Sequence, residues 1–219
     1  MISLEKGRAP SILELKGAAW TRAYVDAVNS ALPSRPERWR HREIIEALRE
    51  EAGARCIYCE AAIEDVSYPH VDHIAPKSLF PERAHQWENL AWACERCNKA
   101  KGDFYSENVG LLNPFEDDPL EHLNFVGGMV FPRIGRQRGK ITTLKLRLNR
   151  SGLLKSRARR LDELQTLVEQ WSAAEEPLKG VLAFAIQEDV EDGEFRQSCR
   201  AFLSRVDFPL DELAERGGS

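Results

Sequence analysis

Two pairs of cysteines restrict this chain more than any other feature of its sequence. Cys56 and Cys59 are separated by two residues, as are Cys94 and Cys97, while Cys199 stands alone. Four thiolates with this spacing are typical of a closed tetrahedral zinc site, which leaves no position for water or substrate. We therefore expect a structural Zn²⁺ ion. The alternative, a pair of redox dithiols, would need thioredoxin-like βαβ surroundings, which the sequence does not show.

The composition is that of a globular protein with a sizeable core. Of 219 residues, 42% are hydrophobic and 30% are charged. No apolar run approaches the roughly 20 residues that a membrane span needs, and residues 1–9 lack the apolar stretch of a secretory signal. We expect a cytoplasmic protein without membrane association, in which paired cysteines bind metal more often than they form disulfides.

Charge is unevenly distributed in the second half of the chain. Residues 132–160 hold eleven Lys or Arg and no acidic residue, whereas residues 161–219 hold fourteen Asp or Glu and five basic residues. The formal net charge of −4 conceals this contrast. Because charges interact over only about 10 Å at physiological salt, a local basic patch can still bind phosphate. The basic stretch is therefore either a surface for nucleic acid or a partner, or the solvated face of a helix.

The chain divides into three regions. Apolar residues recur at helical spacing in residues 1–54 and in residues 132–219, so we expect helices at both ends. The middle region, residues 55–131, holds both cysteine pairs and ends in a Gly-Gly turn between apolar residues, which predicts a hairpin. The last region is a possible partner-binding part. The expected helices cover residues 20–32, 34–53, 154–171, 176–186 and 195–203.

The segment between the cysteine pairs carries groups suited to catalysis. Its 34 residues exceed the about 15–20 of a simple zinc ribbon. Asp72 and His73 lie in a predicted strand that ends before Pro76, and their side chains would point to opposite sides unless the chain bends there. Asn89 follows in a Trp-Glu-Asn-Leu segment.

The second cysteine pair is expected to begin a helix. Cys94, Cys97, Asn98 and Lys101 fall at positions i, i+3, i+4 and i+7, which share one helix face. Zinc bound by the two cysteines would therefore also fix the direction of the Asn98 side chain, opposite the strand that carries Asp72.

This order of residues resembles the HNH (ββα-metal) endonuclease motif, in the variant with a CxxC pair on either side. The resemblance covers about fifty residues and implies an α+β fold, a zinc-stabilised ββα-metal module embedded in a mainly α-helical chain. It also implies one catalytic divalent ion, Mg²⁺ or Mn²⁺, held against the scissile phosphate. Carried over by position, His73 would be the general base, Asp72 and Asn98 would be metal ligands, and Asn89 would brace the loop.

The chemistry of phosphodiester hydrolysis calls for the same residue types. A histidine supplies a base with a pKa near neutrality, and a cation offsets the charge that develops on the phosphate. Many family members have His where this chain has Asn98; an amide oxygen favours a hard ion over a softer metal. His70, on the strand face of Asp72, could bind metal, bind phosphate or make a structural hydrogen bond. The residues expected to contact nucleic acid are Lys77, Lys101, Arg157 and Arg160.

Shorter motifs resemble the HNH subunits of Septu-type antiphage systems and of related retron-associated modules. They lie in residues 2–10, 59–60, 112–119 and 142–150. This resemblance implies a nuclease that cuts DNA, or alternatively RNA, in antiphage defence beside an ABC/SMC-like ATPase. The chain has no GxxxxGK[ST] motif, so any use of ATP would belong to that partner.

Two other functions remain open from the sequence. A stand-alone restriction-type HNH nuclease would cut specific sequences without a partner. A zinc-organised nucleic-acid-binding module without catalysis would bind with an affinity that falls with salt and would give no product with Mg²⁺ or Mn²⁺.

Overall fold

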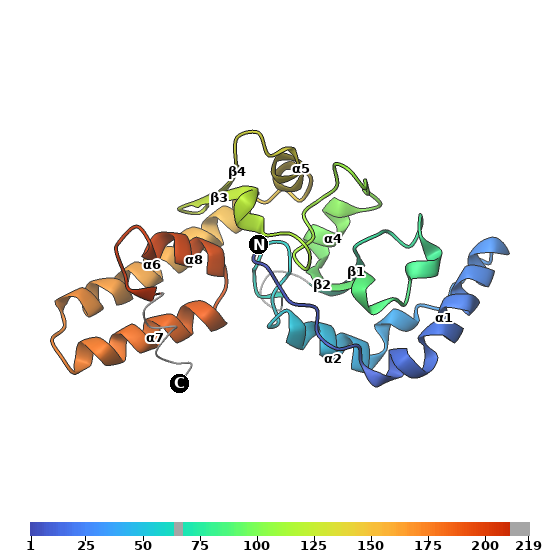
Figure 1. Cartoon of the computed structure of the whole chain (residues 1–219), viewed down its shortest axis with the longest axis horizontal. Coiled ribbons are helices and arrows are strands. Elements are labelled where there is room, and N and C mark those ends of the chain that lie inside the picture. Colours follow the sequence, from blue (N-terminus) through green and yellow to red (C-terminus); the bar gives the residue numbers. More distant parts are fainter. Residues whose placement is uncertain (64–67, 211–219) are drawn as a thin grey trace.

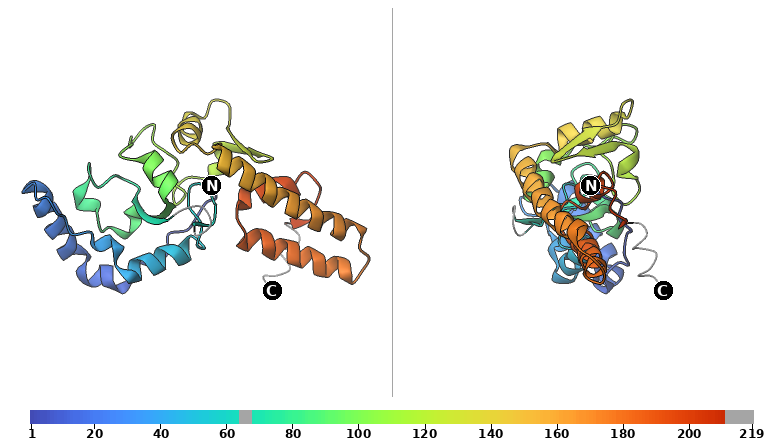
Figure 2. Two further views of the ribbon diagram at one scale, coloured as in Figure 1. Left: turned by 180° about the vertical axis from the view of Figure 1, so that it is seen from behind. Right: turned by 90° about the vertical axis from the view of Figure 1, so that its left-hand side faces the viewer.

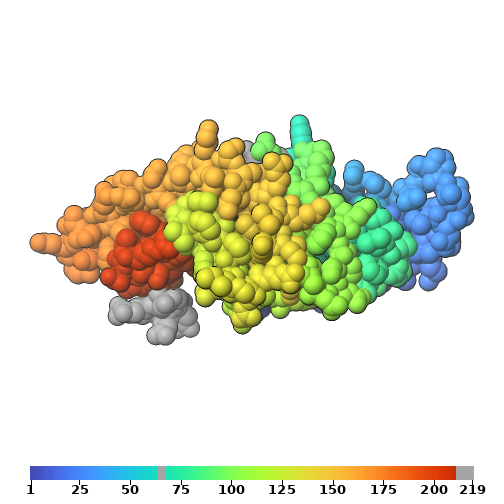
Figure 3. Space-filling view, turned by 90° about the horizontal axis from the view of Figure 1, so that it is seen from above, coloured from blue at the N-terminus to red at the C-terminus, as the bar shows by residue number. Residues whose placement is uncertain are grey.

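The computed structural model describes residues 1–63 and 68–210 of the chain. The described part is elongated, with helix α1 (Ser11–Asn29) at one end and helices α6 (Ser151–Ala173), α7 (Leu178–Asp192) and α8 (Arg196–Leu203) at the other (Figures 1 and 3). Two small antiparallel sheets of two strands each lie between these ends. This mixture confirms the predicted α+β class.

The helices of the N-terminal region differ from the prediction at their starts. Helix α1 begins directly after Pro10, well before residue 20. Helix α2 (Arg42–Glu51) begins later than residue 34, because residues 38–40 form the 3-10 helix η1 (Arg38–Arg40). His41 then caps α2, since its Nδ1 accepts a hydrogen bond from the backbone N–H of Glu43. The apolar residues whose spacing predicted this helix are nevertheless buried in the core, among them Trp39, Ile44 and Leu48.

A strand pair and a helix form the centre of the molecule. Strand β1 (Pro69–His73) pairs antiparallel with β2 (Leu90–Cys94), so that Asp72 lies opposite Ala91 and His73 opposite Leu90. Helix α4 (Glu95–Lys101) follows β2 without a loop. The connection between the strands contains two 3-10 turns, η2 (Pro81–Arg83) and η3 (Trp87–Asn89). Every residue of β2 is buried, which places this strand inside the core.

A second hairpin packs against the start of α6. Strands β3 (Leu123–Val126) and β4 (Met129–Pro132) flank the Gly-Gly turn as predicted, and Gly127 adopts the left-handed conformation that favours glycine. The Asn149 side chain pairs with both backbone groups of Val130, at 2.9 and 2.7 Å. The 3-10 helix η4 (Pro119–Glu121) precedes this hairpin and helix α5 (Gln137–Lys145) follows it.

Two hydrophobic clusters meet along α6. The larger one contains the two cysteine pairs, strand β2 and Leu153, with Val71 of β1 packed against it, whereas the smaller one is formed mainly by α6, α7 and α8 from Leu161 onward. Helices α6 and α7 run side by side as an arm (Figure 2). The division at residues 54 and 131 stays a prediction, and residues 211–219 of the last region lie outside the described part. None of the described helices is long and apolar enough to cross a membrane.

Candidate metal centre and catalytic site

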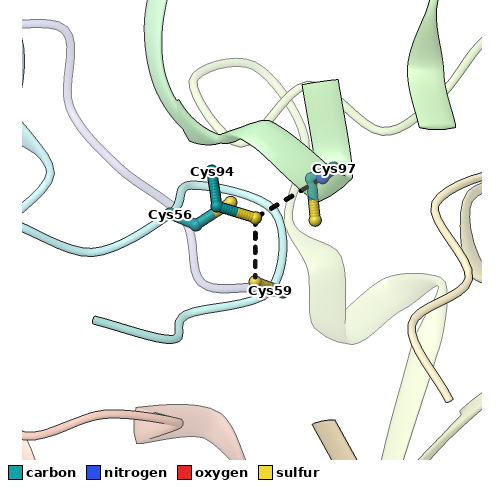
Figure 4. A group of neighbouring side chains, drawn as sticks. All are labelled: Cys56, Cys59, Cys94 and Cys97. Carbon is teal, nitrogen blue, oxygen red and sulfur yellow. Dashed lines mark hydrogen bonds between the residues drawn. The ribbon is translucent and has the colours of Figure 1, made fainter. Parts of the chain in front are cut away.

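The four cysteines of the two CxxC pairs converge on one point (Figure 4). Their Sγ atoms all lie within 4.8 Å of one another, all four residues are buried, and none forms a disulfide. Tetrahedral zinc–thiolate bonds of about 2.3 Å place sulfurs at such separations, so this donor set fits a Zn²⁺ ion. No other group of His, Cys, Asp or Glu within residues 1–63 and 68–210 comes together as a candidate metal site.

Local backbone geometry builds the two halves of this cluster. Cys94 is the N-cap of α4, and its Sγ accepts a hydrogen bond from the Cys97 backbone N–H at 3.4 Å. In the first pair, the Glu60 N–H closes a turn onto the Cys56 carbonyl at 2.9 Å. Hydrogen bonds from Cys56, Cys59 and Cys97 hold the pKa of the Cys94 thiol well below its usual value. The pKa of Cys59 is lowered as well, by hydrogen bonding to Cys56 in the first place, whereas burial raises the pKa of Cys56 and the pKa of Cys97 also lies well above its usual value. Two of the four groups, Cys59 and Cys94, therefore favour the thiolate form that binds metal.

Asp72 is held on the face of β1 that meets helix α4. Its side chain is 3% exposed, and its Oδ2 accepts a hydrogen bond from the Tyr58 hydroxyl at 2.6 Å. Its Oδ1 accepts one from the Lys101 ammonium at 3.0 Å, and the same ammonium donates to the His73 carbonyl at 2.6 Å. Burial, with the charge of Asp72, raises the pKa of Tyr58 well above its usual value, so the hydroxyl remains a donor.

His73 lies on the opposite side of the strand end. Its Nε2 is 3.0 Å from the Ala84 carbonyl oxygen, and its ring meets Trp39 edge to face with centroids 4.9 Å apart. Burial, and then the charge of Lys77, lowers the pKa of His73 to about 4. A neutral imidazole that donates through Nε2 keeps the lone pair on Nδ1, and Nδ1 has no hydrogen-bond partner among the described residues.

Asn98 contacts His70 rather than Asp72. The Asn98 Nδ2 and the His70 Nδ1 are 3.0 Å apart, and both residues are partly exposed. His70 and Asp72 lie two residues apart on one face of β1, whereas Asn98 and Lys101 lie on the facing side of α4. The junction of β1 and α4 thus collects the two expected ligands of a catalytic ion, each with a different partner. The sequence left metal binding, phosphate binding and a structural hydrogen bond open for His70. The structure shows a hydrogen-bond contact, with Asn98.

Asn89 holds together the loop that connects β1 and β2. Its Oδ1 accepts from the Ala75 N–H at 2.7 Å, while its Nδ2 donates to the carbonyls of Ala75 at 3.1 Å and Arg83 at 3.0 Å. This loop also supplies the Ala84 carbonyl that orients His73. Asn89 therefore lies where it can position the base through the backbone. Tyr58 and the Ala84 carbonyl carry no sequence signal, because their roles arise from chain segments that meet only in the fold.

Three of the four basic residues expected to contact nucleic acid lie inside the chain instead. The Lys101 ammonium donates hydrogen bonds to the Asp72 carboxylate and the His73 carbonyl. Arg157 is 2% exposed and donates to the carbonyls of Gly128 and Leu148 at 3.2 and 2.8 Å, while Arg160 pairs with the Asp189 carboxylate at 2.5 Å. This corrects the expectation, since such cations cannot reach a phosphate. Only Lys77 remains accessible, with its Nζ 5.3 Å from the Trp39 ring centre.

Exposed basic side chains gather elsewhere, in a groove between α4 and the segment that joins α5 to α6. Arg96 and Lys99 line it from α4, Lys145 from the end of α5 and Arg147 from the joining segment; all four are exposed. Arg150 lines it as well, and none of the described residues that line it is acidic. We call these five residues the basic groove. The sequence could not indicate it, because the two segments are about fifty residues apart in the chain.

Comparison with known proteins agrees with this geometry. Residues 56–104 match the family model for HNH endonuclease. Septu protein PtuB from Bacillus thuringiensis is 33% identical over 124 residues, which cover 56% of this chain and 46% of that relative. Septu protein PtuB from Bacillus mycoides (strain KBAB4) is 27% identical over 203 residues, 78% of this chain and 68% of the relative. The first match thus spans about half the relative's length. The chain therefore contains an HNH endonuclease domain and, over most of its length, is similar to Septu protein PtuB.

Proposed function

We propose that this chain is a metal-dependent endonuclease that hydrolyses phosphodiester bonds of nucleic acid. The observation that carries this proposal is the setting of His73. The Ala84 carbonyl holds its Nε2, and a pKa of about 4 leaves the ring neutral at pH 7, so Nδ1 is available to take a proton from water. The HNH family match over this segment supports the same chemistry.

Asp72 and Asn98 would hold a hard divalent ion, Mg²⁺ or Mn²⁺, at the junction of β1 and α4. Carboxylate and amide oxygens suit such ions. The hydrogen bonds from Tyr58 and Lys101 leave further lone pairs on the Asp72 carboxylate, which has about four acceptor sites. When bound, the ion would offset the charge that develops on the phosphate. His70, in contact with Asn98, lies close enough to orient that ligand.

The phosphate backbone of the substrate would lie across the basic groove. Arg96 and Lys99 project from the same helix as Asn98, so a strand at the catalytic junction can continue over these cations. Lys77, near His73, would contact the other side of the scissile phosphate. DNA is the proposed substrate, with RNA as the alternative for the test.

A role in antiphage defence rests on the similarity to Septu protein PtuB. We propose that the nuclease works as the effector of a complex with an ATPase subunit. Half of the acidic residues after Leu161 lie on α6 and α7, the arm, which offers a docking face away from the catalytic junction. Co-purification with such an ATPase, lost on removal of residues 161–219, would support this assignment.

The test is a cleavage assay of the purified chain with Mg²⁺, with Mn²⁺ and with chelator, alone and with the ATPase. His73→Ala should lower the cleavage rate about 10²–10⁴-fold, the usual contribution of a general base, while zinc content stays unchanged. His41→Asn is a matched control, because Asn also caps α2. Cleavage by His73→Ala at the rate of the control would contradict the proposal. Binding of nucleic acid without product under every condition would favour the non-catalytic module. Sequence-specific cutting by the chain alone would favour the restriction-type enzyme.

A further inference from the structure

Helix α6 meets the cysteine cluster through Arg150, the residue that precedes its first turn. The Arg150 Nη1 lies 3.7 Å from the Cys97 Sγ, and its Nη2 lies 3.9 Å from the Sγ atoms of both Cys59 and Cys94. Guanidinium N–H groups are donors only, and thiolate sulfur accepts such bonds. One side chain from the C-terminal region therefore contacts three of the four sulfurs.

A second cation lies behind the first without an acidic side chain beside it. Arg157, two turns along α6, bonds to two backbone carbonyls, and its guanidinium stacks 5.4 Å from the Phe195 ring centre. Buried cations are normally paired with an acid, yet no carboxylate of the described residues forms an ion pair with Arg157. Burial lowers the pKa of Arg157 to about 10, and the charges of Cys59 and Cys97 act in the opposite direction.

The charge of a metal-loaded cluster explains the place of Arg150. Four thiolates around a divalent ion carry a double negative charge, and burying such a charge without compensation is costly. We propose that Arg150 is a counter-cation of a four-thiolate metal centre, and that this contact ties helix α6 to the HNH module.

The segment that follows α7 returns the arm to the first cysteine pair. The backbone N–H of Phe195 donates to the Glu60 carbonyl at 3.2 Å, and that of Gln197 donates to the Glu60 carboxylate at 3.0 Å. Glu60 directly follows Cys59. The arm is therefore attached to the metal loop at both ends, so loss of the ion should loosen α6 as well as α4.

The first test measures zinc retention in the full chain and does not depend on cleavage. Groups that hydrogen-bond to metal ligands commonly change metal affinity by about 10–100-fold. Arg150→Met should therefore release zinc to a chromophoric chelator at about 10–100-fold lower chelator concentration than the wild type, and Arg150→Lys should recover part of the loss. Arg159→Met is the control, because Arg159 lies on the same helix and its side chain is 71% exposed.

Two further measurements separate this role from a general packing effect. In the Co²⁺-substituted protein, Arg150→Met should shift the thiolate-to-metal absorption band, since hydrogen bonds to the sulfurs are lost, whereas Arg159→Met should not. Chelation of zinc from the wild type should speed amide exchange in residues 151–158. Zinc retention and absorption of Arg150→Met that match the control would overturn the counter-cation role. Unchanged amide exchange after chelation would overturn the tie between α6 and the cluster.

Discussion

The ammonium group of Lys101 is almost fully buried, and it is shared between the Asp72 carboxylate and the His73 carbonyl. Its place after Asn98 in the helix suggested a phosphate contact, because lysines often flank nuclease sites. In the structure it compensates the charge of Asp72, which without it would retain only the Tyr58 hydroxyl. A buried pair of this kind does not add much stability by its formation, but removal of one partner leaves an uncompensated charge.

Lys101→Met is accordingly expected to lower the free energy of unfolding by about 3–5 kcal/mol, the usual cost of breaking a buried ion pair. Urea denaturation of the zinc-loaded protein measures this change. Lys99→Met, on the same helix but with a side chain that is 71% exposed, should change stability by less than about 1 kcal/mol. If Lys101 instead contacted phosphate, its substitution would weaken nucleic-acid binding and leave stability close to that of the Lys99 variant.

At the scale of the element, the conformation of the loop between β1 and β2 depends on the side chain of Asn89. Asn89 makes three hydrogen bonds to backbone groups of Ala75 and Arg83. The next residue after Arg83 is Ala84, whose carbonyl fixes the ring of His73. A displacement of this loop would therefore also displace the His73 ring. Asn89 itself forms no hydrogen bond with that ring or with the side chains of Asp72 and Asn98.

Asn89→Ala should consequently reduce the cleavage rate by about 10²-fold, since a displacement of about 1 Å in a catalytic group can have that effect. The KM for nucleic acid should change much less than kcat, because the basic groove lies outside this loop and only Lys77 of the proposed phosphate contacts lies within it. Steady-state kinetics of Asn89→Ala measure the effects on kcat and on KM separately. Gln86→Ala, at a neighbouring position of the same loop, is the control. A rise in KM at constant kcat would show that Asn89 acts on binding and not on the position of His73.

Elements with local determinants could be predicted from the sequence. The CxxC spacing and the i, i+3 pattern place Cys94 and Cys97 at the start of α4, because a helix turn brings these positions together whatever surrounds it. The Gly-Gly hairpin has an equally local cause. The start of α2 was misplaced, since the cap by His41 depends on an extended residue that helical periodicity does not reveal.

The directions of Arg157 and Arg160 could not be predicted from composition, but the periodicity holds a clue. The buried face of α6 contains Leu153, Leu161 and Leu164, and Arg157 falls four residues from each of the first two. The apolar residues Leu154 and Ala158 also recur at helical spacing, but Leu154 is only partly buried and Ala158 is exposed. Apolar spacing alone therefore does not show that Arg157 lies on the buried face. The partners that explain Arg157 come from distant segments, so only the fold identifies them.

At the scale of the whole molecule, the distribution of accessible cations separates a nucleic-acid surface from an internal framework. Residues 132–160 are rich in basic side chains, but Arg150 contacts the cysteine cluster, Arg157 is buried on backbone carbonyls and Arg138 pairs with Asp117. Lys145 and Arg147 remain exposed, and they join Arg96 and Lys99 of α4 in the basic groove. The groove therefore combines cations from two parts of the chain that the fold brings to one face.

Removal of Lys145, at the end of α5, and of Arg147, which follows it, provides a direct test of this surface. Each phosphate contact to duplex DNA contributes about 0.9 to the slope of log affinity against log salt, so the double variant with Lys145→Gln and Arg147→Gln should lower that slope by about two. Affinity should fall similarly for unrelated sequences, because phosphate contacts carry no base specificity. Arg159→Gln, outside the groove, should keep the wild-type slope. Fluorescence anisotropy with two unrelated duplexes at a series of salt concentrations gives both quantities, and equal slopes for all three proteins would place the substrate elsewhere.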